Sequence, residues 1–406
     1  MTAGADIDLL SPGAVADPQG ALARLREEDP VHWSPHHRAW ILTRFDDVAA
    51  ALRDVAFYSS DRVTSVFEDK LSPAEREERL PTFRILGGWM VFHDPPDHTR
   101  LRDLVKKAFT VRAVEQLRPR VRELVDELLA APLARGSCDL VREVAYPLPA
   151  TIVAEMLGVP ASDRDLFKSW SDDITTLVFG GPDARERRVR AQAGLVELAA
   201  YLGDLVSHYR ASPADNLITG LVQAQEAGQA LSDDEVVSTC TLVLFGGHET
   251  TTNLIANGFL ALLRHPDELR ALVADPALAA TAVGELNRFD GPSKFVVRRA
   301  AADAELRGRT IRAGDAVLLA QCAANRDPRA FDRPDVLDLR RDPNRHLAFG
   351  HGIHYCLGAP LARMEAQEAL PRLAAALRDA RLTAEPAWLP LIVSRGLASL
   401  PIAFTP

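Results

Sequence analysis

One run near the end of the chain constrains its fold most: Phe-Gly-His-Gly-Ile-His-Tyr-Cys-Leu-Gly at residues 349–358. The glycines of this run lack a Cβ, so the backbone can turn tightly and approach a flat ligand. Residues 359–366 read as the first turns of a helix, where Pro360 is tolerated. Cys356 is therefore expected near a helix N-terminus, whose macrodipole favours an anionic sulfur. A thiolate in that position is a candidate iron ligand.

The ordinary alternative for Cys356 is a small buried hydrophobe. The chain has 4 cysteines and no CxxC pair, so neither a structural zinc site nor a disulfide framework is expected. The net charge of -9 argues against a general nucleic-acid binder. The N-terminal residues lack the basic and apolar regions of a signal peptide, and no apolar run is long enough to span a membrane. These features predict a cytoplasmic protein.

Apolar residues at three-to-four spacing predict that most of the chain is amphipathic helix. The clearest helical patterns cover residues 113–133, 191–210, 233–263 and 266–288. Strand-like segments are short, at residues 37–43 and 304–317, and residues 59–89 and 325–354 read as irregular. We expect one mainly α domain over residues 1–406, with a small β portion.

The cysteine run resembles the haem-binding loop of the cytochrome P-450 family, in which the cysteine is the axial iron ligand. The resemblance spans most of the chain, from the helix after Asp94 to the turn at residues 395–397. It implies the cytochrome P-450 fold, a mostly α triangular prism, with haem b (iron protoporphyrin IX) as cofactor. It also implies that Cys356 binds the iron and that Phe349 and Gly350 belong to the cofactor-binding loop.

A second informative segment, residues 242–253, has two adjacent glycines in a strongly apolar helical pattern. Such glycines are costly in a helix and are kept where something approaches the backbone or the helix bends. The segment resembles the family's oxygen-binding helix. The resemblance implies that Gly246 borders the cofactor, that Thr250 orients dioxygen and that Glu249 relays protons. The alternative is a kinked core helix whose threonines bond their own backbone.

Glu285 and Arg288 are three residues apart and so share one helical face. Most such pairs are solvated and contribute little to stability. The family resemblance instead implies a structural E-x-x-R pair in the core. Its third, basic partner would come from the segment before the cysteine, and Arg341 is the candidate.

Haem carries two propionates, so its site needs positive or hydrogen-bond-donating groups. By resemblance, the candidates are His98 and Arg102, Arg298, and His354. Arginine and histidine suit this role because they donate directional hydrogen bonds to carboxylates. Arg299 could exchange roles with Arg298, although the family spacing favours Arg298. The alternative for each is a solvated surface charge.

The implied function is a monooxygenase that inserts one atom of dioxygen into a hydrophobic small molecule. Its electrons would come from a separate ferredoxin or flavodoxin with its reductase, docked on a basic patch of Arg102, Lys106, Lys107 and Arg112. An alternative is a haem-thiolate enzyme that uses peroxide, or that couples or desaturates its substrate. A more remote alternative is a non-catalytic haem sensor. The intact Glu249–Thr250 pair favours the monooxygenase.

The resemblance also locates a substrate pocket, along residues 65–92, 166–181, 242–246, 294–297 and 392–394. Lys294 is the unusual residue among these mostly apolar segments. We expect it to point outward, as most lysines do, with a contact to a substrate carboxylate as the alternative. Charged residues at 68–70 and 75–79 suggest a solvent-facing, mobile lid.

Overall fold

The computed structural model describes residues 7–56, 58–61, 63, 71–163, 166, 170, 174–175, 178, 185–226 and 231–405. The chain forms two compact units, each assembled from separate segments. The first contains residues 1–58, 115–149 and 249–406, and the second contains residues 59–114 and 150–248. The long helix α13 (Asp233–Arg264) contributes its first half to the second unit and its second half to the first. The prediction of a single domain stays a prediction.

The first unit is built around a sheet with the strand order β1-β2-β8-β5-β3. Strands β1 (Val31–Ser34) and β2 (Ala39–Leu42) form an antiparallel hairpin. Strand β8 (Ala316–Ala320) runs parallel to β2 and antiparallel to β5 (Phe295–Ala300), and β3 is Tyr58–Ser59. The predicted strands at 37–43 and 304–317 thus correspond to β2 and to three short strands, β6 (Ala304–Leu306), β7 (Arg309–Ile311) and β8.

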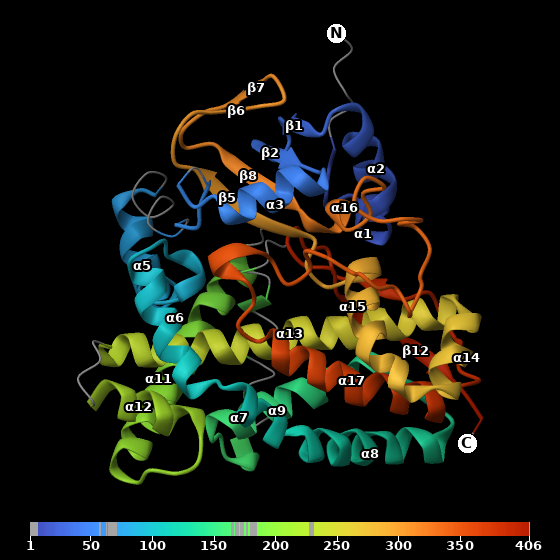
Figure 1. The fold of residues 1–406 in the computed structure, drawn as a ribbon. Helices are drawn as coiled ribbons and strands as arrows, with labels where there is room; N and C mark the ends of the chain where they lie inside the picture. Colours follow the sequence, from blue (N-terminus) through green and yellow to red (C-terminus); the bar gives the residue numbers. More distant parts are fainter. Residues whose placement is uncertain are drawn as a thin grey trace. The chain divides into compact units, whose positions relative to one another are not determined.

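Successive side chains of β2 and β8 alternate between two core clusters, so both faces of this sheet are buried. Leu42 and Leu319 belong to a core cluster on the side of α3 (Phe45–Arg53). Ile41 and Leu318 belong to a second cluster, which includes leucines of α2 (Pro18–Glu28). Successive side chains of a strand point to opposite faces, and Figure 1 shows the sheet with α2 and α3 beside it.

The helical part of the first unit is dominated by α17 (Ala359–Ala376), which lies against α8 (Arg118–Arg135), α14 (Pro266–Ala274) and α15 (Ala279–Asp290) (Figure 1). Helix α17 has Pro360 in its first turn, as predicted. Smaller elements complete the unit: α1 (Pro12–Ala16), η2 (Val141–Ala145), η4 (Pro276–Leu278), α16 (Gln321–Ala324), η5 (Gly352–His354), β4 (Ser137–Asp139), β9 (Arg381–Leu382), β10 (Ala387–Trp388), β11 (Leu397–Ser399) and β12 (Pro401–Ala403).

The described part of the second unit is mainly helical. Its helices are α5 (Pro73–Gly87), η1 (Met90–Phe92), α6 (Asp97–Ala108), η3 (Ala161–Asp163), α11 (Arg185–Ala211) and α12 (Leu217–Glu226). Helices α7 (Val111–Gln116) and α9 (Pro147–Leu157) cross the boundary between the units. None of the helices among the described residues is long and apolar enough to cross a membrane.

Two predicted segments are wrong. Residues 266–288 form two helices and a 3-10 turn, because the Asp275 side chain caps a new start at Pro276. Residues 73–87 are the helix α5 instead of an irregular loop, and a capping box between Ser72 and Glu75 begins it. The proposed lid therefore includes the first turns of a helix at Glu75, and residues 68–70 lie outside the described residues.

Candidate haem-thiolate site

The cysteine loop runs from Phe349 to the start of α17 and closes through its own backbone. The amide of Cys356 donates to the carbonyl oxygen of Phe349 at 2.8 Å. Gly350 and Gly352 have φ angles of 74° and 73°, in the left-handed region that favours glycine. A Cβ on Gly352 would also lie 2.9 Å from the carbonyl oxygen of Leu52. Tight turning and close approach therefore both require glycine in this loop.

The sulfur of Cys356 differs from the other thiols of the chain, because Cys356 is exposed and the other three cysteines are buried. Burial raises the pKa of Cys138 and Cys240 to about 12 and that of Cys322 to about 11. Those three thiols therefore stay protonated at neutral pH. The alternative of a buried side chain at Cys356 is therefore wrong.

Aromatic and cationic side chains surround the start of this loop. The guanidinium of Arg363, on α17, lies 4.5 Å from the ring centroid of Phe349, within the range of a cation–π contact. The Tyr355 ring lies 6.4 Å from the same ring. Burial lowers the pKa of the neighbouring His346 to about 4, with smaller contributions from Arg363 and Arg288. His346 is therefore a neutral packing residue beneath the loop.

The predicted oxygen-binding segment is continuous helix within α13, and its two glycines differ in their surroundings. A Cβ on Gly247 would lie 2.8 Å from Cγ2 of Val153, so α9 packs closely there. A Cβ on Gly246 would meet no described atom nearer than Leu242 Cδ1 at 4.0 Å. Gly247 is thus required by helix packing, whereas close packing among the described residues does not require glycine at position 246.

Glu249 and Thr250, the predicted proton relay, lie in the second half of α13. Glu249 is buried and Thr250 is half-buried. The side-chain amide of Asn253 donates to Glu249 Oε1 at 3.3 Å. Asn253 was not predicted from the sequence, although its spacing of four residues from Glu249 was the available signal.

The Glu285–Arg288 pair is fully buried, as the resemblance implied. Arg288 donates from Nε and Nη2 to the two carboxylate oxygens of Glu285, each at 2.8 Å. Arg341 is the third partner, with Nε 3.1 Å from both oxygens. The amide of Asn344 also donates to Glu285, at 3.1 Å. The prediction of Arg341 is confirmed, and Asn344 was not predicted.

Two of the predicted propionate ligands lie in the first unit. Arg298 is buried in β5, with Nη1 3.0 Å from the carbonyl oxygen of Val297. Arg299 follows it in the strand and so points to the opposite face, where a Cβ on Gly314 would lie 3.7 Å from it. His354 is half-buried in η5. The two arginines therefore cannot exchange roles without a change of register.

The other two predicted ligands, His98 and Arg102, lie one turn apart on α6 in the second unit. His98 is buried, and this burial, followed by the charge of Arg102, lowers its pKa to about 4. His98 is therefore neutral at neutral pH. It offers a hydrogen bond, and Arg102 is the cation of the pair.

Lys294 does not point outward, so that expectation is wrong. The residue is only 2% exposed, and its Nζ donates to the carbonyl oxygen of Leu391 at 2.6 Å. Burial lowers its pKa to about 8. The carbonyl that receives this ammonium comes from 97 residues further along the chain, which explains why local sequence could not reveal it.

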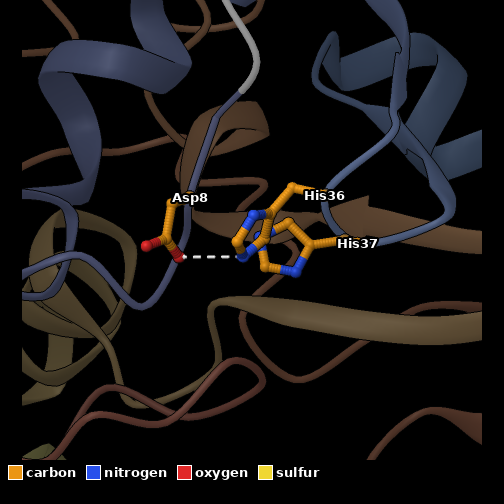
Figure 2. A group of neighbouring side chains, drawn as sticks. All are labelled: Asp8, His36 and His37. Carbon is orange, nitrogen blue, oxygen red and sulfur yellow. Dashed lines mark ion pairs between the residues drawn. The ribbon is translucent and has the colours of Figure 1, made fainter.

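A separate polar group joins the N-terminal segment to the β1–β2 turn (Figure 2). Asp8 Oδ1 lies 3.5 Å from His36 Nε2, and the His37 ring lies beside His36. Possible metal-binding atoms of the three side chains lie within 4.8 Å of one another. However, His37 Nε2 accepts a hydrogen bond from the Leu9 amide at 3.0 Å. Metal coordination through either ring nitrogen would break that bond, so the group is better described as an anchor of the N-terminal segment.

Comparison with known proteins agrees with the fold. A family model described as Cytochrome P450 matches residues 197–275 and 276–376. Cytochrome P450 107B1 of Saccharopolyspora erythraea is 41% identical, over 99% of each chain. Vitamin D(3) 25-hydroxylase of Pseudonocardia autotrophica is 41% identical, over 98% of this chain and 96% of its own.

Among solved structures, that of CalO2 superposes with a TM-score of 0.91 at 38% identity, covering 99% of this chain and 100% of that one. The predicted fold class, mainly α with a small β portion, is therefore confirmed. The near-complete coverage in both sequence and structure shows that the chain belongs to the cytochrome P450 family, whose members are haem b-containing monooxygenases.

Proposed function

We propose that the protein inserts one oxygen atom from dioxygen into a hydrophobic small molecule, by hydroxylation or epoxidation, with Cys356 as the ligand of the haem iron. The observation that carries this proposal is the place of Cys356, an exposed residue held three residues before α17 by a loop with two left-handed glycines. The other three thiols are buried. The donor chemistry of this chain therefore fits a haem-thiolate at one cysteine.

The remaining haem contacts are proposed from the family's motif positions. Phe349, Gly350 and Gly246 would lie against the macrocycle. The propionates would be bound by His98, Arg102, Arg298 and His354. Arg298 is buried in β5, and its guanidinium donates the directional, charge-assisted hydrogen bonds that suit a carboxylate, which supports its place in this set.

When bound, a thiolate-ligated haem supplies the redox chemistry that cleaves dioxygen. In the balanced reaction, one dioxygen, two electrons and two protons convert a substrate C–H bond into C–OH and release one water. The protein must supply the protons. Glu249 is a buried carboxyl group, and we propose that it passes protons to the hydroxyl of Thr250, which delivers them to the site of dioxygen reduction.

The electrons would come from a separate ferredoxin or flavodoxin with its reductase. The basic patch proposed for docking is Arg102, Lys106, Lys107 and Arg112. Support comes from the exposed side chains of Lys106 and Arg112. Lys106 lies 3.6 Å from Asp103, an exposed pair that salt or an acidic partner can readily replace.

The carbon monoxide difference spectrum of the reduced protein tests the iron ligand. We expect the Soret band of a thiolate-ligated haem for the wild type and its loss in Cys356→Ala. Cys322→Ala is the matched control, because it removes a buried thiol and should keep the band. A thiolate-type band that persists in Cys356→Ala would refute the assignment.

A panel of hydrophobic compounds, screened for a shift of the haem spin state, addresses the substrate class. A compound that shifts the spin state should also be oxidised when a surrogate ferredoxin, its reductase and NADPH are added. Binding without any oxygen incorporation from ¹⁸O-labelled dioxygen would contradict the proposed reaction.

A further inference from the structure

The side chain of Asn253 connects the proposed acid of the proton relay to a turn near the end of the chain. Asn253 lies one helical turn after Glu249 and is 1% exposed. Its Nδ2 donates to Glu249 Oε1 at 3.3 Å. A carboxylate on a flexible side chain has several rotamers, and a hydrogen bond from a buried amide favours one of them.

Gly396 lies close to the same amide. A Cβ on Gly396 would lie 2.7 Å from both Nδ2 and Oδ1 of Asn253. Real Cβ atoms essentially never come so close. Any residue other than glycine would therefore displace either the turn or the amide of Asn253.

The turn that carries Gly396 is itself firmly held. The amide of Arg395 donates to the carbonyl oxygen of Pro292 at 2.7 Å, and its Nε lies 2.5 Å from Asp290 Oδ1. Its carbonyl oxygen accepts a hydrogen bond from Asn257 Nδ2 at 2.9 Å. The position of Asn253 is thus determined by a fixed backbone and not only by packing within α13.

We infer that Asn253 is a positioning residue that holds the carboxylate of Glu249 in the orientation from which it delivers protons. Gly396 is the close contact that fixes Asn253. This inference rests on the proposed relay through Glu249. Asn253 acts through Glu249 and has no direct part in the chemistry.

The test measures NADPH-driven dioxygen consumption by the haem-loaded protein with a surrogate ferredoxin and reductase, in water and in deuterium oxide. No substrate is needed, because dioxygen reduction itself consumes protons. Asn253→Ala should slow consumption about five- to tenfold and raise the solvent isotope effect. Asn257→Ala is the matched control: it is equally buried and bonds the same turn, yet has no bond to Glu249 among its described contacts. Because it loosens the turn but keeps the bond from Asn253 to Glu249, it should change both quantities much less than Asn253→Ala does.

A double-mutant cycle separates positioning from a merely structural role. In a Glu249→Gln background, Asn253→Ala should have no further effect on consumption or on the isotope effect. An equal fold-loss in both backgrounds, or no loss in either, would overturn the inference. If Glu249→Gln itself changes nothing, the proposed relay fails instead, so the two failures are distinguishable.

Gly396→Ala provides a second test that does not depend on turnover. The new methyl group should lower the unfolding midpoint in the wild type by overlap with the Asn253 amide. The shift should be smaller in Asn253→Ala, which removes that amide. An equal shift in both backgrounds would show that Gly396 does not act on Asn253.

Discussion

The ammonium of Lys294 bonds the carbonyl oxygen of Leu391 at 2.6 Å in a position that is almost fully buried. This contact ties the start of β5 to the segment that leads into the Gly396 turn. Backbone bonds reinforce it, since the amides of Lys294 and Phe295 both donate to the carbonyl oxygen of Val393, at 2.8 and 3.2 Å. A lysine expected at the surface is thus part of the core.

Lys294→Met should remove a pH-dependent contribution to stability. Burial lowers the pKa of Lys294 from 10.5 to about 8. Between these two values the unfolded chain binds the extra proton, so the free energy of unfolding rises with pH in the wild type. The destabilisation is fully present below about pH 8 and has a size of about 3 kcal/mol. In urea unfolding, the free energy of unfolding of the wild type should therefore rise relative to that of Lys294→Met from about pH 7 to about pH 10. A constant difference would contradict the buried charge.

Glu365→Gln should remove a pH dependence of the opposite sign, because Glu365 is a buried acid that stays protonated in the folded protein. Glu365 is fully buried on α17, and burial raises its pKa well above 4.5. Above the unfolded pKa the unfolded chain releases a proton that the native protein keeps, so wild-type stability falls with rising pH, up to the folded pKa. The glutamine variant should gain about 1.4 kcal/mol per pH unit relative to the wild type in that window. Equal slopes just above the unfolded pKa would show an ionised Glu365.

These two residues mark where local sequence stops being informative. The cysteine loop, the Glu285–Arg288 pair and the extent of α13 are encoded in contiguous or closely spaced residues, and the sequence predicts them. Lys294 and Glu365 acquire their properties from distant partners. Nothing near Lys294 in the sequence indicates the carbonyl of Leu391.

Two other differences between the predicted and the observed helices had a local signal in the sequence. The helix break at Asp275–Pro276 follows from a side-chain cap and a proline, both of which are present in the sequence within a continuous apolar periodicity. The capping box of Ser72 and Glu75 likewise indicates the start of α5. Asn253 could be paired with Glu249 by its spacing, whereas the approach of Gly396 required the tertiary structure.

Arg341→Ala should destabilise the protein far more than Arg340→Ala. Arg341 shares the fully buried carboxylate of Glu285 with Arg288, and it also donates to three backbone carbonyls, those of Asp332, Arg333 and Val336. Removal of one partner of a buried ion pair costs about 3 kcal/mol. The neighbouring Arg340 is exposed, so its loss should cost less than about 0.5 kcal/mol. Chemical unfolding of the two variants gives the comparison, and equal losses would contradict a structural role for the third partner.

Glu368→Gln should lower the free energy of unfolding at neutral pH but not in acid. Glu368, on α17, accepts hydrogen bonds from Arg118 and Arg122 of α8 and from Arg372. Burial alone would raise its pKa, but the bonds from Arg122 and Arg118 outweigh burial and lower it to about 2.

Because the folded pKa of Glu368 lies below the unfolded value of 4.5, its contribution is complete above about pH 4.5 and is lost as the pH falls towards about 2. Its arginine partners are partly solvated, so we expect about 1–2 kcal/mol at neutral pH. Glu115→Gln is the control, because Glu115 accepts from Arg118 at the exposed end of the same network, and it should cost much less stability than Glu368→Gln. Urea unfolding between about pH 7 and about pH 3 should show the wild type and Glu368→Gln converging. A difference that persists undiminished in acid would mean that the packing of Glu368, rather than its charge, joins α17 to α8.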